Sequence, residues 1–173
     1  MPRQYIPPRI KNMSDTEWLS EDEREAWLAL VSIMFRLPGA VETQLRSEED
    51  MSLAEYLVLA MLSEASDHRH RMSELAAATN TSQSRLSRIV ARMEKAGLVT
   101  REGRLDDRRV VIAEITDAGI ERIRQAAPAH VRHVREIVFD RLSSEQVGQL
   151  VEIGRALNRG PAEDVATGLR SIA

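Results

Sequence analysis

Hydrophobic residues recur at helical spacing through most of this chain. The clearest case runs from Ser82 to about Ala96, and Gly97 follows where glycine commonly ends a helix. The apolar residues of this segment fall at i, i+3, i+4 and i+7: Leu86, Ile89, Val90 and Met93. This spacing predicts an amphipathic helix with one buried face and one polar face.

Capping boxes, in which a serine is followed three residues later by Glu or Gln, mark three more helix starts. The serines are Ser20, Ser52 and Ser143. The first box predicts a helix over 20–47 that is kinked or broken at Pro38-Gly39. The second opens SLAEYLVLAMLSEA, which is apolar nearly all round and is therefore expected to be buried. The third opens the last clear helix of the chain.

The pattern changes after Gly97. Residues 98–101 and 110–115 are rich in β-branched residues, and the charged segment EGRLDDRR separates them, which predicts a β-hairpin with a polar tip. Thr116 then starts a long helix that Pro128 should kink. Upstream, a short helix is predicted from Ser73, and SDHRHR before it is expected to be a polar loop.

A helix-turn-helix followed at once by a two-stranded ribbon is the winged-helix arrangement. The sequence therefore predicts a mainly α fold with a small two-stranded β-wing, in which a winged helix-turn-helix core is flanked by dimerisation helices. The expected organisation is an N-terminal arm (1–17), a dimerisation helix kinked near Pro38 (18–50), the winged helix-turn-helix DNA-binding domain (51–119), C-terminal dimerisation helices (120–160) and a tail (161–173).

The flanking helices carry more apolar surface than a small winged-helix core can cover. The simplest arrangement that covers it is a two-fold dimer. Such a dimer would set the two copies of the 82–96 helix about 34 Å apart and require a palindromic DNA site. An all-α cap folded within one monomer is the alternative.

Composition excludes several classes of protein. The chain has no cysteine, so disulfides, thiolate metal sites and thiol chemistry are excluded. Its longest apolar run, Ala26 to Phe35, is shorter than the roughly 20 residues of a membrane span, and no signal peptide precedes it. We therefore expect a cytoplasmic protein with no membrane partner.

The net charge of −3 is unevenly distributed. Residues 71–109 contain nine basic and five acidic residues, a net charge of +4, so the rest of the chain carries −7. This basic window coincides with the predicted 82–96 helix and the hairpin. An acidic protein with one basic stretch indicates a local surface for a polyanion.

The side chains of this window suit DNA reading. Arg can form two hydrogen bonds to guanine, Gln can do so to adenine, and Ser bonds bases or phosphates. An arginine at a wing tip can enter the minor groove. The predicted DNA-binding residues are Ser82, Gln83, Ser84, Arg85, Ser87, Arg88 and Arg92 on the helix and Arg104, Asp107, Arg108 and Arg109 on the wing. A solvated charged surface, or a winged-helix module that binds another protein, remains the alternative.

Several of these residues resemble a known family. The run from MSELAAATNTSQSRLSRIV to Asp107-x-Arg109 and Ile115-Thr116-Asp117-Ala118-Gly119 resembles the winged-helix core of MarR-type bacterial transcriptional regulators. The resemblance implies a homodimer that binds palindromic promoter DNA, often as a repressor relieved by a small ligand. It places base readers at Gln83, Ser84, Ser87 and Arg88 and the wing motif at Asp107 and Arg109.

Other sites are less well supported by the sequence. No enzyme motif occurs, so we expect no catalytic residue, no enzyme activity and no cofactor. The pairs His68/His70 and His130/His133 have spacing that could suit a metal, but each is better explained as surface or helix residues, and we predict no metal. Residues available to line a ligand pocket are Trp27, Met34, Phe35, Tyr56 and Met61, although residues of these types more often belong to a hydrophobic core.

Overall fold

The structure is a computed structural model of the 173-residue chain and describes residues 17–103 and 110–158. The chain divides into two compact units, of which one ends at Leu37 and the other begins at Pro38. Helix α1 (Glu21–Glu49) crosses that boundary with Pro38 inside it. Of the two predicted alternatives at Pro38-Gly39, the broken helix is therefore wrong, and the kink stays a prediction. A proline removes only one backbone donor, and the helix continues on both sides of it.

The first unit contains the N-terminal part of α1. Its start is a complete capping box, because the Ser20 amide donates to Glu23 Oε2 (2.7 Å) and the Glu23 amide donates to Ser20 Oγ (3.2 Å). By length and composition alone α1 could cross a membrane, and only 6% of its most apolar stretch is buried. The large apolar side chains exposed in this unit are Trp18, Leu19, Trp27, Leu28, Ile33, Met34 and Phe35.

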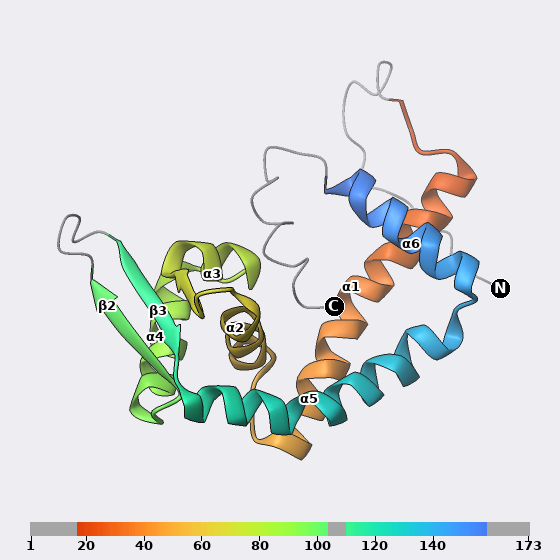
Figure 1. The fold of residues 1–173 in the computed structure, drawn as a ribbon. Helices are drawn as coiled ribbons and strands as arrows, with labels where there is room; N and C mark the ends of the chain where they lie inside the picture. The colour runs from red at the N-terminus through yellow and green to blue at the C-terminus, as the bar shows by residue number, and fades with distance from the viewer. Residues whose placement is uncertain (1–16, 104–109, 159–173) are drawn as a thin grey trace. The chain divides into compact units, whose positions relative to one another are not determined.

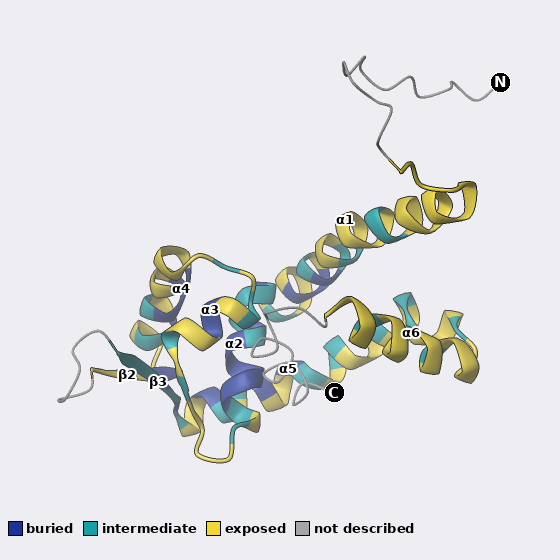
Figure 2. Cartoon of the chain, turned by 90° about the horizontal axis from the view of Figure 1, so that it is seen from above, coloured by how far each residue is buried: buried dark blue, intermediate teal, exposed yellow. Residues whose placement is uncertain are grey.

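Helix α2 (Leu53–Glu64) forms the centre of the second unit, as its uniformly apolar sequence predicted. Around it pack α3 (Met72–Ala78), α4 (Gln83–Lys95) and a small sheet (Figure 1). Figure 2 shows dark, buried surface on α2 and on the inner faces of α3 and α4. The side chains that are least exposed include Val58, Leu59, Leu62, Leu75, Leu86 and Val90.

The sheet has three antiparallel strands in the order β1-β3-β2. Strands β2 (Val99–Gly103) and β3 (Val111–Ile115) are the predicted hairpin. Strand β1 (Arg69–Arg71) lies within the segment expected to be a loop and pairs with β3, so the wing sheet has three strands rather than two. Backbone hydrogen bonds to β3 hold β1 in the sheet. These bonds do not depend on side chains, so β1 needs no apolar pattern.

The C-terminal part consists of α5 (Asp117–Ile137), a 3₁₀ turn (Phe139–Arg141) and α6 (Ser144–Leu157). Helix α5 begins at the predicted position, with Thr116 as its N-cap, and continues through Pro128. Helix α6 opens with the predicted Ser143–Gln146 capping box. None of its residues is buried, and its exposed apolar side chains are Leu150, Val151, Ile153 and Leu157.

Candidate nucleic-acid interface

Helix α4 has the two faces that its sequence predicted. Ser82 caps its N-terminus by accepting a hydrogen bond from the Arg85 amide (3.4 Å). The buried face is Leu86, Ile89, Val90 and Met93. The outer face, where Figure 2 shows α4 in the colour of exposed residues, contains Ser82, Gln83, Ser84, Arg85, Ser87 and Arg88. One helix therefore combines apolar anchoring with a polar, partly cationic surface open to a partner.

The end of α4 is fixed by a left-handed glycine. Gly97 has φ of 73°, as predicted for a residue that ends a helix in the left-handed conformation. Its carbonyl accepts from Thr116 Oγ1 (2.7 Å), and the Thr116 amide donates to the Leu98 carbonyl (3.1 Å). The end of α4 is thereby hydrogen-bonded to the start of α5.

The outer side chains near the start of α4 make few bonds that would compete with a ligand. Arg88 Nε donates to the Ser84 carbonyl at a long 3.4 Å, and Ser82 Oγ lies 3.3 Å from Ser84 Oγ. Among the described residues, no acidic side chain forms an ion pair with Arg85 or Arg88. Both guanidinium groups therefore keep donors available for bases or phosphates.

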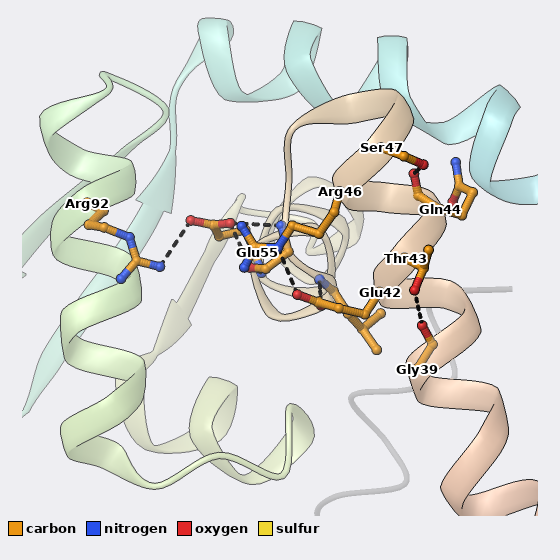
Figure 3. Close-up of polar contacts among 10 residues, drawn as sticks. Gly39, Glu42, Thr43, Gln44, Arg46, Ser47, Glu55 and Arg92 are labelled. Atoms are coloured by element: carbon orange, nitrogen blue, oxygen red, sulfur yellow. Dashed lines mark hydrogen bonds and ion pairs between the residues drawn. The ribbon is translucent and has the colours of Figure 1, made fainter.

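Arg92 differs from these residues because its guanidinium is engaged. Its Nη2 lies 3.3 Å from Glu55 Oε1 at the start of α2 (Figure 3). Burial acts to raise the pKa of Glu55, but hydrogen bonds from Ser52 and the Arg92 charge outweigh it, so this pKa lies below its ordinary value. Glu55 is therefore ionised at neutral pH and attracts Arg92.

A cleft of about 270 Å³ adjoins the predicted readers. It is lined by Arg71, Met72, Ser73, Gln83, Ser87, Arg101, Val110 and Val111. Gln83 and Ser87 were predicted from the sequence, whereas Arg71, Ser73 and Arg101 were not. Both arginines belong to the basic window, which was the available signal, but no local pattern indicates that β1 and β2 bring them to α4.

Arg101 also connects the wing to α4. Its Nε and Nη2 donate to Glu94 Oε2 at 3.0 and 2.5 Å. These hydrogen bonds hold the pKa of Glu94 below its usual value. Strand β2 and helix α4 are thus joined by a bidentate contact of Arg with a carboxylate oxygen. The other predicted wing residues, Arg104, Asp107, Arg108 and Arg109, lie outside the described residues.

The candidate ligand-pocket residues fall in different places. Trp27, Met34 and Phe35 are exposed in the first unit, and Phe35 is 81% exposed. Met61 is 1% exposed and packs in the core of α2. Tyr56 lines an open groove of about 270 Å³ between α2 and α5, together with Ala60, Ser63, Glu64, Ile120, Ile123, Arg124 and Ala127. Burial, and then Glu64, raise the pKa of Tyr56.

In the part of the chain that the structure describes, no group of three His, Cys, Asp or Glu residues is placed to hold a metal ion. His68 Nδ1 faces the Leu62 carbonyl and His70 Nδ1 faces Glu74 Oε2, each at 3.3 Å. The His130 ring centroid is 4.2 Å from that of Tyr56. His130 Nδ1 and His133 Nε2 are buried without a hydrogen-bond partner.

An exposed polar helix at the second position of a helix-turn-helix, followed by an antiparallel wing, defines a winged-helix protein of the kind that regulates transcription. A model of the MarR family matches residues 49–110. Sco3205, a MarR family transcriptional regulator from Streptomyces coelicolor solved in complex with DNA, is 40% identical, with a TM-score of 0.76 and coverage of 85% of this chain and 97% of that one.

Two further relatives are also transcriptional regulators. AbsC, another MarR family transcriptional regulator from Streptomyces coelicolor, is 38% identical, with a TM-score of 0.70 and coverage of 90% of this chain and 99% of that one. The transcriptional repressor YetL of Bacillus subtilis (strain 168) is 25% identical over 129 residues, which are 75% of this chain and 76% of YetL. The chain belongs to the MarR family, which confirms the resemblance seen in its sequence, and these relatives are regulators rather than enzymes.

Proposed function

We propose that the protein is a homodimeric repressor that binds palindromic promoter DNA in the cytoplasm and is released from it by a small ligand. The observation that carries the proposal is the outer face of α4, where Gln83, Ser84, Ser87 and Arg88 are exposed above a buried apolar face. In this proposal those four side chains read base edges in the major groove.

The remaining predicted residues supply positioning rather than sequence reading. The capped N-terminus of α4 at Ser82, with Arg85 beside it, suits a backbone phosphate because free amides and a positive charge meet there. Arg71 and Arg101, which both line the adjoining cleft, extend the cationic surface. We assign Arg104, Asp107, Arg108 and Arg109 to a wing that contacts the minor groove.

The dimer part of the proposal rests on uncovered apolar surface. Helix α6 has no buried residue, and the first unit exposes two tryptophans and Phe35. Apolar area of this extent is expected to be covered by a protein partner, and a second copy satisfies it with matching surfaces. Ile153→Glu, which places a charge on the apolar face of α6, should give a smaller species by analytical ultracentrifugation and weaken DNA binding. A dimer of undiminished stability would exclude α6 from the interface.

The first experiment is selection of bound fragments from genomic DNA by the purified full chain at near-physiological salt. We expect one palindrome with half-sites about one helical turn, roughly 34 Å, apart. Weak binding without sequence preference that disappears as salt rises would refute the proposal and favour a protein partner.

Substitution of Arg88 then tests the reading face on the selected operator. Arg88→Ala should cost about 1–3 kcal/mol of binding free energy and relax base preference at one position, whereas Arg109→Ala should weaken binding more uniformly across sequences. Lys95→Ala removes the same charge from the exposed end of the same helix and is the matched control. Equal losses in Arg88→Ala and Lys95→Ala would assign Arg88 a general electrostatic role only.

The ligand part of the proposal assigns Tyr56 to the effector site, because its side chain lines the open groove between α2 and α5. The other four candidates do not line this groove: Met61 is 1% exposed, and Trp27, Met34 and Phe35 belong to the first unit. A metabolite library screened for a raised melting temperature and for release of operator DNA tests this assignment. A hit whose effect is unchanged in Tyr56→Phe and Tyr56→Ala would remove Tyr56 from the site.

A further inference from the structure

Arg92 is bonded across the fold, unlike Arg85 and Arg88 on the same helix. Its guanidinium reaches Glu55, which precedes it by 37 residues and stands in the first turn of α2. The Glu55 side chain is 19% exposed and that of Arg92 is 60% exposed. A pair with one half-buried member is screened less than two fully exposed charges.

Both oxygens of the Glu55 carboxylate are occupied. Oε2 accepts from the Ser52 amide (2.9 Å) and from Ser52 Oγ (2.6 Å), which completes the capping box of α2. Oε1 is left for Arg92. Because the cap holds the carboxylate in one orientation, Arg92 meets a fixed anion.

The start of α2 is in turn fixed to the C-terminal part of α1. The Leu53 amide, a donor without a partner inside its own helix, donates to Glu42 Oε2 (2.6 Å). Glu42 Oε1 accepts from Arg46 Nε (2.9 Å). Figure 3 shows these contacts running from α1 through the first turn of α2 to α4. All of them lie within the unit that begins at Pro38.

The spacing of residues on α4 connects this network to the reading face. Ser84, Arg88 and Arg92 follow one another at intervals of four, so they form a single line along the helix surface. Holding Arg92 at a fixed point therefore restricts rotation of α4 about its axis. A small rotation would move Ser84 and Arg88 away from the positions in which they meet base edges.

We infer that Glu55 and Arg92 are positioning residues that set the orientation of α4 for sequence reading, with Glu55 fixed by the α2 cap and the α2 start fixed by Glu42. Arg92 in this arrangement does not bind DNA. This inference rests on the proposed DNA-binding function and gives Arg92 a role different from the DNA contact predicted from the sequence.

Glu55→Gln isolates the Arg92 contact. Glutamine at this position preserves a capping box, as the chain itself demonstrates at α6, where Gln146 Oε1 accepts from the Ser143 amide (2.9 Å). The variant therefore loses the charge that holds Arg92 and keeps the cap. Glu64→Gln, at the opposite end of α2, is the control for charge. It measures how the loss of one negative charge alone changes DNA affinity, and we expect that loss to raise the affinity.

The experiment compares wild type, Glu55→Gln, Arg92→Gln, their double variant, Arg92→Lys and Glu64→Gln on the selected operator and on unrelated DNA across a range of salt. We expect each single Gln substitution in the pair to weaken operator binding about two- to fivefold, the scale of a partly exposed ion pair. The double variant should be no weaker than either single one, and Arg92→Lys should recover most of the loss. Affinity for unrelated DNA should change no more in Glu55→Gln than in Glu64→Gln, and the dependence of operator binding on salt should stay unchanged.

Changes of operator affinity and salt dependence in the opposite direction would refute the inference. If Arg92 instead contacts a phosphate, Glu55→Gln will bind the operator more tightly than Glu64→Gln, and Arg92→Gln will lower the salt slope by about one. Amide hydrogen exchange without DNA gives a second test, because α4 amides should exchange faster in Glu55→Gln than in Glu64→Gln. Equal exchange would overturn the inference. A wild-type protein with no preferred sequence would refute the proposed function itself, and the inference with it.

Discussion

Gly119→Ala tests how closely α5 approaches the segment that follows α4. Gly119 lies in the first turn of α5, and its amide donates to Thr116 Oγ1 (3.1 Å). A Cβ at this position would clash with the Leu98 carbonyl oxygen and would lie 2.6 Å from Ile115 Cγ1. The Leu98 carbonyl cannot move freely, because it accepts the Thr116 amide at 3.1 Å.

Two effects of opposite sign decide the stability of Gly119→Ala. Helix propensity favours alanine by about 1 kcal/mol. Forcing a methyl group into a filled site costs about 1–3 kcal/mol, and contact with backbone rather than a flexible side chain places this site at the upper end. We therefore expect a net loss of about 1–2 kcal/mol in the free energy of unfolding. For a chain of this length that lowers the melting temperature by roughly 2–4 °C per kcal/mol.

The assay is urea unfolding followed by circular dichroism at a fixed protomer concentration, since dimerisation contributes to apparent stability. Gly148→Ala in α6 is the matched control, because no atom of the described residues lies within 4 Å of its added Cβ. Propensity alone should stabilise the control by about 0.5–1 kcal/mol. If Gly119→Ala were as stable as Gly148→Ala, the close approach of α5 to Leu98 would be refuted.

Three further predictions concern the same unit. Leu86→Ala, which truncates a fully buried side chain of α4, should cost about 2–5 kcal/mol of unfolding free energy; a loss below 1 kcal/mol would contradict the buried face. Gly97→Ala, at φ of 73°, should cost about 1–2 kcal/mol, and an unchanged urea midpoint would count against the left-handed helix end. Burial, and then His133, lower the pKa of His130 below 6.5, so the unfolded chain binds more protons below about that pH and stability should fall on acidification. His130→Phe, which keeps a ring beside Tyr56, should flatten this part of the pH profile, and a profile identical to wild type would show that His130 does not produce it.

The sequence predicted those parts of the molecule that local patterns determine. Helix α4, its buried face and its glycine end follow from apolar spacing and from the conformation that Gly97 adopts. The α2 and α6 starts follow from capping boxes that span only four residues. Each of these features is complete within a short segment, so a single sequence contains it.

The sequence did not predict the features that depend on contacts between distant segments. Strand β1 was missed because it has no alternating apolar pattern. Its place in the sheet depends on backbone pairing with residues 112–114, which are distant in the sequence. Arg71 and Arg101 were counted as charges, but their common cleft depends on the sheet register. The Arg92–Glu55 contact joins residues 37 apart, which no local pattern reveals. A helix broken at Pro38 was one of two predicted alternatives and is wrong, because a helix that continues on both sides tolerates one missing donor.

The composition of β1 has a consequence for how the protein behaves at high concentration. The open edge of a sheet can recruit strands from other molecules and so start aggregation. Here that side of the sheet ends in only three residues, Arg69, His70 and Arg71, two of them cationic, and Arg69 is held by Glu114 at 2.6 Å. A short, charged strand is a poor template for another chain. Strand β1, which the sequence did not predict, therefore protects β3 from pairing with other molecules. Arg69→Val would remove one charge from this edge and favour self-association.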